Sequence, residues 1–183
     1  MARISDPGLE DRIVRAARDL WHAGGESALS MRTVAKAAGT NTPAVYRRFR
    51  TREDILRALV ESYQRQLYNA LLPCASLPEI GDAVLDFALG HPREYELIMS
   101  GLLGRMSRER PNFEFVAQRC AEWHGGKARD YEALVFAIWA LAHGTAMLLI
   151  SGTVREDQAA RARRIFAKSL QRLLANASKL RGL

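Results

Sequence analysis

The sequence places apolar residues at helical spacing along almost its whole length, and this pattern limits the possible folds more than any other feature. The first group recurs at intervals of three and four residues: Leu9, Ile13, Ala16, Ala17, Leu20 and Trp21. No segment shows the sustained alternation of apolar and polar residues that is typical of a half-buried strand. We therefore predict an all-α fold of about nine helices, counted from helix start and stop signals.

Capping residues and glycines divide the N-terminal part of this pattern. Gly24-Gly25 is expected to end the first helix, because glycine readily takes the left-handed conformation of a helix end. Ser30 then offers an N-cap for a short helix that Gly39 ends, and Asn41 caps a second short helix over about residues 42–49. The turn between these two short helices is predicted to be tight.

A long helix is predicted to follow, because Thr51-Arg52-Glu53-Asp54 resembles a capping box and Pro73 provides a stop. Similar signals predict the remaining helices over residues 76–89, 92–103, 113–123, 130–151 and 156–180. We place a domain boundary inside the long helix. This gives a helix-turn-helix domain over residues 1–54 and a helical ligand-binding and dimerisation bundle over residues 55–183.

Positive charge is concentrated in one short window. The chain has a formal net charge of +7, and residues 29–57 contain seven basic and two acidic side chains, which gives +5. A basic balance suits a polyanionic partner. Taken alone, a run of arginines is more often a solvated helix face.

The two short helices in this window have the properties of a helix-turn-helix. Val34 and Ala38 in the first helix, and Val45 and Phe49 in the second, are expected to form a shared core. The first helix would support the second, which could enter a DNA major groove about 12 Å wide.

The same residues resemble the DNA-binding domain of the TetR family. The resemblance covers roughly residues 9–60 and rests on an Ala35-x-x-Ala38-Gly39 turn, a Tyr46-x-x-Phe49 pair and the charged start Arg52-Glu53-Asp54. A looser similarity extends over residues 138–144, which resemble a Trp-and-His-Gly segment of the eighth helix of many members. The resemblance implies a transcription regulator, in most cases a repressor, that forms a homodimer through its last two helices and binds a palindromic double-stranded DNA operator.

Carried over to this chain, the resemblance also implies individual contacts with DNA. It places four side chains against base edges: Thr42, Pro43, Ala44 and Arg47. It places four others on phosphates or at the groove edge: Arg32, Tyr46, Arg48 and Arg52. At Arg52 the chain departs from the family, where lysine is commoner. Both residues are cations, so the phosphate contact is expected to survive with altered geometry.

Family members usually bind a small-molecule effector among the helices that follow the DNA-binding domain. We expect such a pocket between Pro78 and Ser151, and ligand binding there is expected to move the helix that begins at Arg52. The candidate lining residues are Tyr95, Met99, Leu102, Phe115, Trp123, Trp139, His143 and Met147. The same residues would also suit an ordinary helical core. His143 could bond a ligand, titrate as a switch or simply pair with a neighbouring helix.

The apolar stretch from Ala133 to Ile150 raises the question of a membrane span. It falls short of the ~20 residues that a span needs, so we expect a buried helix and no membrane partner. Because this helix is apolar on nearly all sides, a second subunit is a plausible cover. The N-terminus lacks the apolar run of a signal peptide, and the two cysteines, Cys74 and Cys120, form no CxxC pair. Both features favour the cytoplasm.

Two other classes of function remain open. One is a helical-bundle enzyme, although the sequence contains no nucleophile motif, no phosphate-binding glycine loop and no metal-binding spacing among His22, His91 and His124. We therefore expect no catalytic residue, metal or cofactor. The other is an architectural DNA-binding protein without a ligand, which would show little sequence preference.

Overall fold

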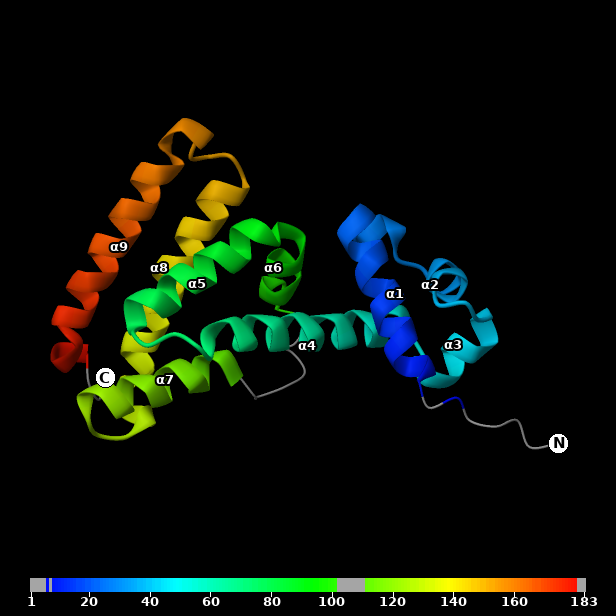
Figure 1. Ribbon diagram of the computed structural model, residues 1–183, viewed down its shortest axis with the longest axis horizontal. Coiled ribbons are helices and arrows are strands. Elements are labelled where there is room, and N and C mark those ends of the chain that lie inside the picture. The colour runs from blue at the N-terminus through cyan, green and yellow to red at the C-terminus, as the bar shows by residue number, and fades with distance from the viewer. Residues whose placement is uncertain (1–5, 7, 102–110, 181–183) are drawn as a thin grey trace. The chain divides into compact units, whose positions relative to one another are not determined.

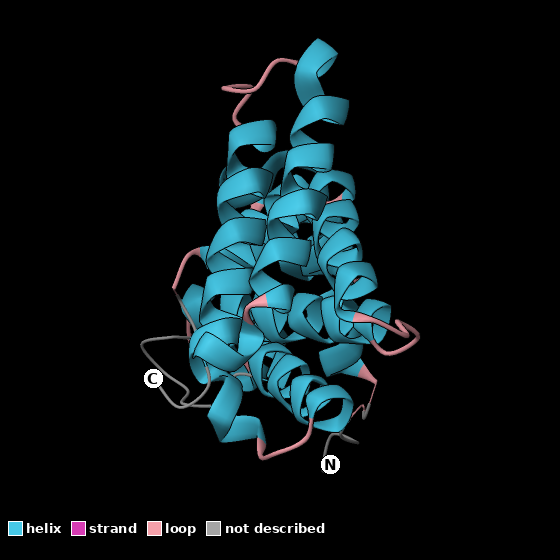
Figure 2. Ribbon diagram, turned by 90° about the vertical axis from the view of Figure 1, so that its left-hand side faces the viewer, coloured by secondary structure: helices cyan, strands magenta, loops and turns pink. Residues whose placement is uncertain are grey.

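The described part of the chain is entirely helical. The computed structural model describes residue 6, residues 8–101 and residues 111–180, except for the side chain of Ser178. Within these ranges it contains nine α-helices, four short 3-10 helices and no strand (Figure 2). The predicted all-α class is confirmed.

The chain forms two compact units, of which the first comprises the described residues up to Tyr63 together with residues 93–101. Its α-helices, labelled in Figure 1, are α1 (Leu9–Gly24), α2 (Met31–Ala37), α3 (Thr42–Arg48), the first part of α4 (Arg52–Leu71), and α6 (Pro92–Met99) apart from its first residue. A short 3-10 helix, η1 (Gly25–Ala28), follows α1. The sequence suggested a boundary after residue 54. In the structure α4 belongs to the first unit as far as Tyr63, whose ring lies 5.9 Å from the Arg18 guanidinium of α1.

The second unit contains the end of α4 and most of the C-terminal half of the chain. Its further elements are α5 (Leu77–Gly90), α7 (Pro111–His124), η2 (Ala128–Tyr131), α8 (Glu132–Ile150), η3 (Glu156–Gln158), α9 (Ala159–Ala175) and η4 (Ala177–Leu180). Within this unit α8 and α9 lie side by side, and both contact α5 (Figure 1).

Local sequence signals account for the ends of the first three α-helices. Ser30 forms a capping box with Thr33, and the Asn41 side chain accepts a hydrogen bond from the Ala44 backbone N–H. Gly25 and Gly39 have φ values of 62° and 65°, which is the left-handed region in which a side chain would be strained. The predicted caps and stops of these helices are confirmed.

One element lies outside its predicted domain. The sequence predicted α6 as part of the C-terminal bundle, but the structure packs it in the first unit against α1. The indole Nε1 of Trp21 donates to the Arg93 backbone oxygen at 3.2 Å, and His22 Nδ1 lies 2.9 Å from a carboxylate oxygen of Glu94. Glu94 is only 4% exposed, so the contact with His22 gives this buried carboxylate a polar partner.

The second unit depends on a close approach of α5 and α9 at Gly81. A methyl group at this position would lie 2.6 Å from Cδ2 of Leu170 and 3.0 Å from the ring of Phe166. Both side chains are about 1% exposed and are held on all sides by the core. Glycine is therefore the residue that lets these two helices approach each other.

We expect Gly81→Ala to lower the free energy of unfolding by about 1–2 kcal/mol, because overpacking outweighs the better helix propensity of alanine. Gly90→Ala, in the last position of the same helix and with open space around it, is the matched control. Urea denaturation followed by circular dichroism measures both variants. Equal stability of the two would contradict the packing argument.

Candidate functional site

The helix pair α2–α3 forms a rigid unit with a glycine turn. Thr40 donates its backbone N–H to the Ala35 carbonyl at 2.9 Å, and this bond closes the turn that Gly39 opens. Pro43 lies in the first turn of α3, where the missing N–H costs nothing. The beginning and direction of α3 are therefore fixed by bonds that the turn itself supplies.

A small buried core joins the two helices. Val34 of α2 and Val45 of α3 are fully buried, and Ala38 and Phe49 are each 7% exposed. The predicted shared core of the helix pair is confirmed. Because these apolar contacts fix one face of α3, the opposite face is presented as a rigid surface.

The outward face of this pair is basic and contains most of the predicted DNA-contact residues. Arg32, Pro43, Tyr46, Arg47 and Arg48 are exposed, and Thr42 is half-buried. Tyr46 is 50% exposed, which is unusual for a large aromatic side chain without a partner surface. One Arg48 Nη donates to the Asp6 backbone oxygen at 3.1 Å, which ties the end of α3 to the residues before α1.

Two of the residues assigned to DNA have other surroundings. Ala44, expected against a base edge, is only 4% exposed, because it lies next to Val45 on the buried side of α3. Arg52, expected on a phosphate, is bonded within the domain. Its Nε donates to the Leu29 carbonyl at 3.0 Å, and its two Nη atoms donate to the carboxylate and carbonyl of Glu26 at 3.1 and 3.0 Å.

The same surface includes two cations that the residue-by-residue assignment left out. Lys36, in the last turn of α2, and Arg50, just after α3, are both exposed. The local excess of positive charge was the signal that could have added them. Exposed cations of this kind suit the phosphate backbone, whereas base reading needs side chains on α3 itself.

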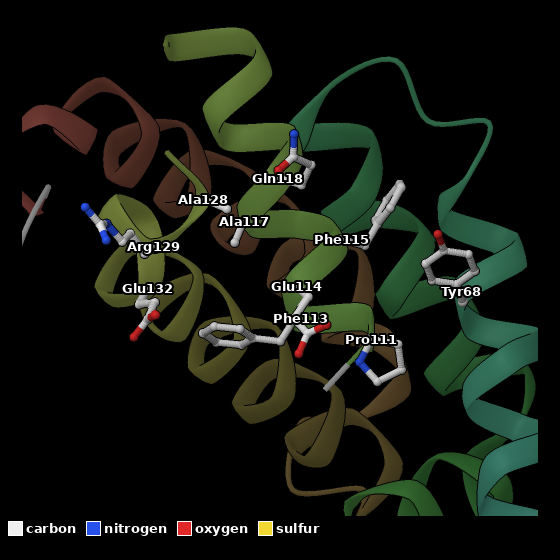
Figure 3. A pocket seen from close by; sticks show the side chains of 10 residues that line it. All are labelled: Tyr68, Pro111, Phe113, Glu114, Phe115, Ala117, Gln118, Ala128, Arg129 and Glu132. Atoms are coloured by element: carbon white, nitrogen blue, oxygen red, sulfur yellow. The ribbon is translucent and has the colours of Figure 1, made fainter. Parts of the chain in front are cut away.

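The second unit contains an open cleft of about 530 Å³ along α7. Figure 3 shows Tyr68 and Phe115 at one end, Arg129 and Glu132 at the other, and Phe113 between them. The rings of Tyr68 and Phe115 meet edge to face, with their centroids 5.2 Å apart. Aromatic walls with a few charged groups are the composition of a small-molecule site.

In the described part of the chain, the candidate effector residues are dispersed and do not all line this cleft. Of its candidate residues only Phe115 lines this cleft, and Leu102 lies outside the described residues. Tyr95 and Met99 are on α6 and belong to the first unit. The sequence could not predict where each of these residues lies, because aromatic and methionine residues recur at helical spacing in a core, in a pocket and on an interface alike.

The remaining candidates lie on α7 and α8, outside the cleft along α7. Trp123 is 37% exposed, with the Arg119 guanidinium 5.8 Å from its ring. Trp139 is 43% exposed and stacks on His143, with the ring centroids 6.0 Å apart. Burial lowers the pKa of His143, so its imidazole is neutral near pH 7. Met147, one turn further along α8, is half-buried.

One face of α8 is apolar and uncovered. Phe136 and Leu148 are 57% and 46% exposed, and Ile165 of the neighbouring helix α9 is 55% exposed. By length and composition alone, residues 128–150 could cross a membrane, since η2 extends α8 to 23 residues. The expectation that this stretch is too short for a span was therefore wrong. Only 28% of the most apolar part of this helix is buried. The prediction of a buried helix is therefore wrong for the single chain.

The cysteine and metal chemistry of the described residues is limited. Burial raises the pKa of Cys120 to about 11 and also raises the pKa of Cys74, so both thiols stay protonated near neutral pH. In the described part of the chain, no three His, Cys, Asp or Glu side chains are grouped so as to hold a metal ion.

Sequence models of two domains match the chain. One is described as "Bacterial regulatory proteins, tetR family" and matches residues 13–59. The other is described as "Tetracyclin repressor-like, C-terminal domain" and matches residues 77–173. No curated protein sequence matches the chain significantly. The first match covers the helix pair and its basic surface, and the second covers α5 to α9.

Solved structures share the fold across nearly the whole chain. A variant of TetR from Acinetobacter baumannii AYE, in complex with minocycline, is 20% identical, with a TM-score of 0.68 over 93% of this chain and 97% of the other. The multidrug binding protein EbrR, complexed with imidazole, is 23% identical, with a TM-score of 0.64 over 92% and 90% of the two chains. A TetR-like transcriptional regulator from Rhodococcus sp. RHA1 is 17% identical, with a TM-score of 0.62 over 94% and 99%.

Proposed function

The chain belongs to the TetR family of bacterial regulatory proteins, and from this premise we propose that it is a cytoplasmic, homodimeric repressor that a small molecule releases from its operator. Its domains are those of a DNA-binding transcriptional regulator. This family and this fold are those of regulators, which are not enzymes. The observation on which the proposal rests is the exposed basic face of α2–α3, whose opposite side is buried.

The DNA interface that we propose uses α3 as the reading helix. Arg47 would read a base edge, since arginine can contact guanine with two donors, and Thr42 and Pro43 would approach the bases from the first turn of α3. Arg32, Lys36, Tyr46, Arg48 and Arg50 would contact phosphates or the groove edge. The exposure of these side chains supports the assignment.

We expect wild-type protein to protect a two-fold symmetric site in the DNA upstream of its own gene or in a site selected from random sequence. Arg47→Ala should weaken specific binding by about 1–3 kcal/mol per half-site, roughly 5- to 150-fold, because alanine cannot donate hydrogen bonds to a base. Arg65→Ala, an exposed site on α4 outside the first unit, removes the same charge and should bind like wild type. Footprinting and fluorescence anisotropy measure both.

Equal binding of the wild type to operator and random DNA would instead favour an architectural protein without a preferred sequence. No DNA binding even at low salt would contradict the proposed interface altogether.

We propose that the uncovered face of α8, with the adjoining part of α9, pairs with the same face of a second copy. Four large apolar side chains there are exposed in the single chain, and exposed patches of this kind mark an interface. A two-fold pair also matches a palindromic operator, whose half-sites are read by two identical helices. A family of DNA-binding regulators favours a partner subunit over a lipid bilayer as the cover of this face.

We expect Leu148→Glu to raise the dimer dissociation constant by more than about 100-fold, because each subunit would bury an unpaired charge costing at least about 3 kcal/mol. Leu72→Glu, at a site of similar exposure (44%) beyond the end of α4, is the matched control and should stay dimeric. Light scattering after size-exclusion chromatography reports both masses. A monomeric wild type, or two equally dimeric variants, would exclude this interface.

The cleft along α7 is our proposed effector site. Its aromatic walls and its charged ends would suit an organic molecule of drug size, and two proteins of similar fold are known in complex with minocycline and with imidazole. α4 reaches this cleft through Tyr68 and begins at Arg52 in the first unit. A ligand that favours one position of α4 could therefore shift the spacing of the two reading helices.

We expect a compound screen, with minocycline included, to yield molecules that release the protein from its operator. Gln118→Trp, at the exposed rim of the cleft, should reduce the potency of such a molecule at least about tenfold by filling the site. Gln66→Trp, also exposed but away from the cleft, should leave potency unchanged. Anisotropy of labelled operator is the readout, and an effect of equal size in both variants would place the effector elsewhere.

A further inference from the structure

The Arg52 guanidinium, at the first position of α4, is bonded to the connection between α1 and α2. Its Nε and one Nη donate to the backbone carbonyls of Leu29 and Glu26, both at 3.0 Å, while the other Nη donates to the Glu26 carboxylate at 3.1 Å. The side chain is 31% exposed, so these bonds lie at the edge of the domain rather than in open solvent.

These acceptors lie directly before α2. The Glu26 carbonyl also receives the Leu29 N–H at 3.2 Å, and Leu29 itself is 3% exposed. The next residue, Ser30, is the N-cap that holds the first turn of α2 through the Thr33 N–H at 3.1 Å. A short connection must find partners for its backbone carbonyls, and here a side chain from α4 supplies a donor to Leu29 and a second donor to Glu26. The guanidinium therefore fixes the peptide from which α2 begins.

The start of α4, where Arg52 lies, is also fixed by hydrogen bonds. The Asp54 carboxylate accepts the Thr51 N–H at 2.9 Å, and the Thr51 hydroxyl oxygen accepts the Asp54 N–H at 3.2 Å. This capping box starts α4, and it holds the pKa of Asp54 below its usual value mainly through the Thr51 N–H bond. Arg52 thus extends from a defined helix start.

The chemistry of the side chain matters because three acceptors are bonded at once. An arginine presents five donors in one rigid plane, whereas a lysine has a single ammonium on a flexible stem. Lysine would keep the positive charge but could not bridge the Leu29 and Glu26 carbonyls in the same way. Charge and bridging geometry can therefore be separated by one substitution.

We propose that Arg52 is a positioning residue for operator binding: it clamps the start of α2 to the start of α4 and so sets where α3 stands on the helix that continues into the second unit. This inference rests on the DNA interface proposed above. It gives Arg52 a role in the spacing of the two reading helices, which in a dimer must match half-sites about 34–36 Å apart. It replaces the phosphate contact that the sequence suggested.

The first test compares Arg52→Lys with Arg52→Gln on the operator across a salt titration. A clamp predicts that both variants bind at least about tenfold more weakly and that the slope of log Kd against log salt stays at the wild-type value. A phosphate contact predicts that Arg52→Lys binds like wild type and that Arg52→Gln lowers the slope by about 0.9 for each phosphate that the protein no longer neutralises. That second pattern would overturn the proposal.

A second readout separates positioning from general stability. Operators with one base pair added to or removed from the spacer should be bound more weakly than the native operator by wild-type protein. A loosened clamp should reduce this discrimination by at least about threefold in Arg52→Lys, measured below the melting temperature of the variant. Unchanged spacer discrimination in a folded, weakly binding variant would mean that Arg52 is structural only.

A third variant tests the clamp without changing Arg52, so it stays informative even if substitutions of Arg52 prevent folding. Glu26→Ala removes a negative charge near the DNA-binding surface, so electrostatics alone predicts tighter binding. The clamp predicts weaker binding, by up to about fivefold, since the Glu26 carboxylate is 72% exposed and its ion pair with Arg52 is therefore weak. Glu53→Ala removes the same charge from an exposed site in the first turn of α4 and is the control.

Failure of the clamp and failure of the proposed function would give different binding results. If wild-type protein protects no symmetric operator, the proposed function fails before Arg52 is tested. If the wild type binds its operator and Glu26→Ala binds more tightly, as Glu53→Ala is expected to, only the clamp is wrong.

Discussion

The packing of α2 against α3, in which Val34 and Val45 are both fully buried, is the interaction on which the DNA-binding surface depends. It fixes one face of α3 against α2, and the exposed cations on the opposite face are useful only because that face is held rigidly. The contact is short-range along the chain, and the tight turn at Gly39 brings it together. A rigid reading helix therefore needs only about twenty residues, which is why local sequence signals define it so completely.

The fold could be predicted from the sequence where its determinants are local. Ser30, Asn41 and Gly39 specify caps and a turn through atoms within three or four residues, and each acts as expected. The shared core of α2 and α3 followed from helical spacing in the same way. The family resemblance added the expected roles of the elements in DNA binding and dimerisation, which local signals alone could not provide.

The parts that could not be predicted depend on contacts between residues far apart in the chain. α6 packs on α1 through Glu94 and Arg93, which are about 70 positions from their partners, His22 and Trp21. Sequence periodicity says that such a helix has an apolar side but not which neighbour covers it. The same limit explains the dispersed effector candidates: Tyr95 and Trp139 fit a pocket pattern equally well, yet the first is buried in the first unit and the second is exposed on α8.

DNA binding and effector binding, the two proposed activities, both depend on α4. This helix is unbroken from Arg52 to Leu71 and contributes to both units, so a change at Tyr68 in the α7 cleft is covalently linked to the helix start beside α2. An unbroken helix transmits a displacement only if its far end is firmly attached; otherwise the displacement is absorbed by local rearrangement. The hydrogen bonds from Arg52 to the residues before α2 provide such an attachment. Effector control would thus depend on the clamp as much as on the cleft, and a regulator with a loose clamp would bind its ligand without releasing its DNA.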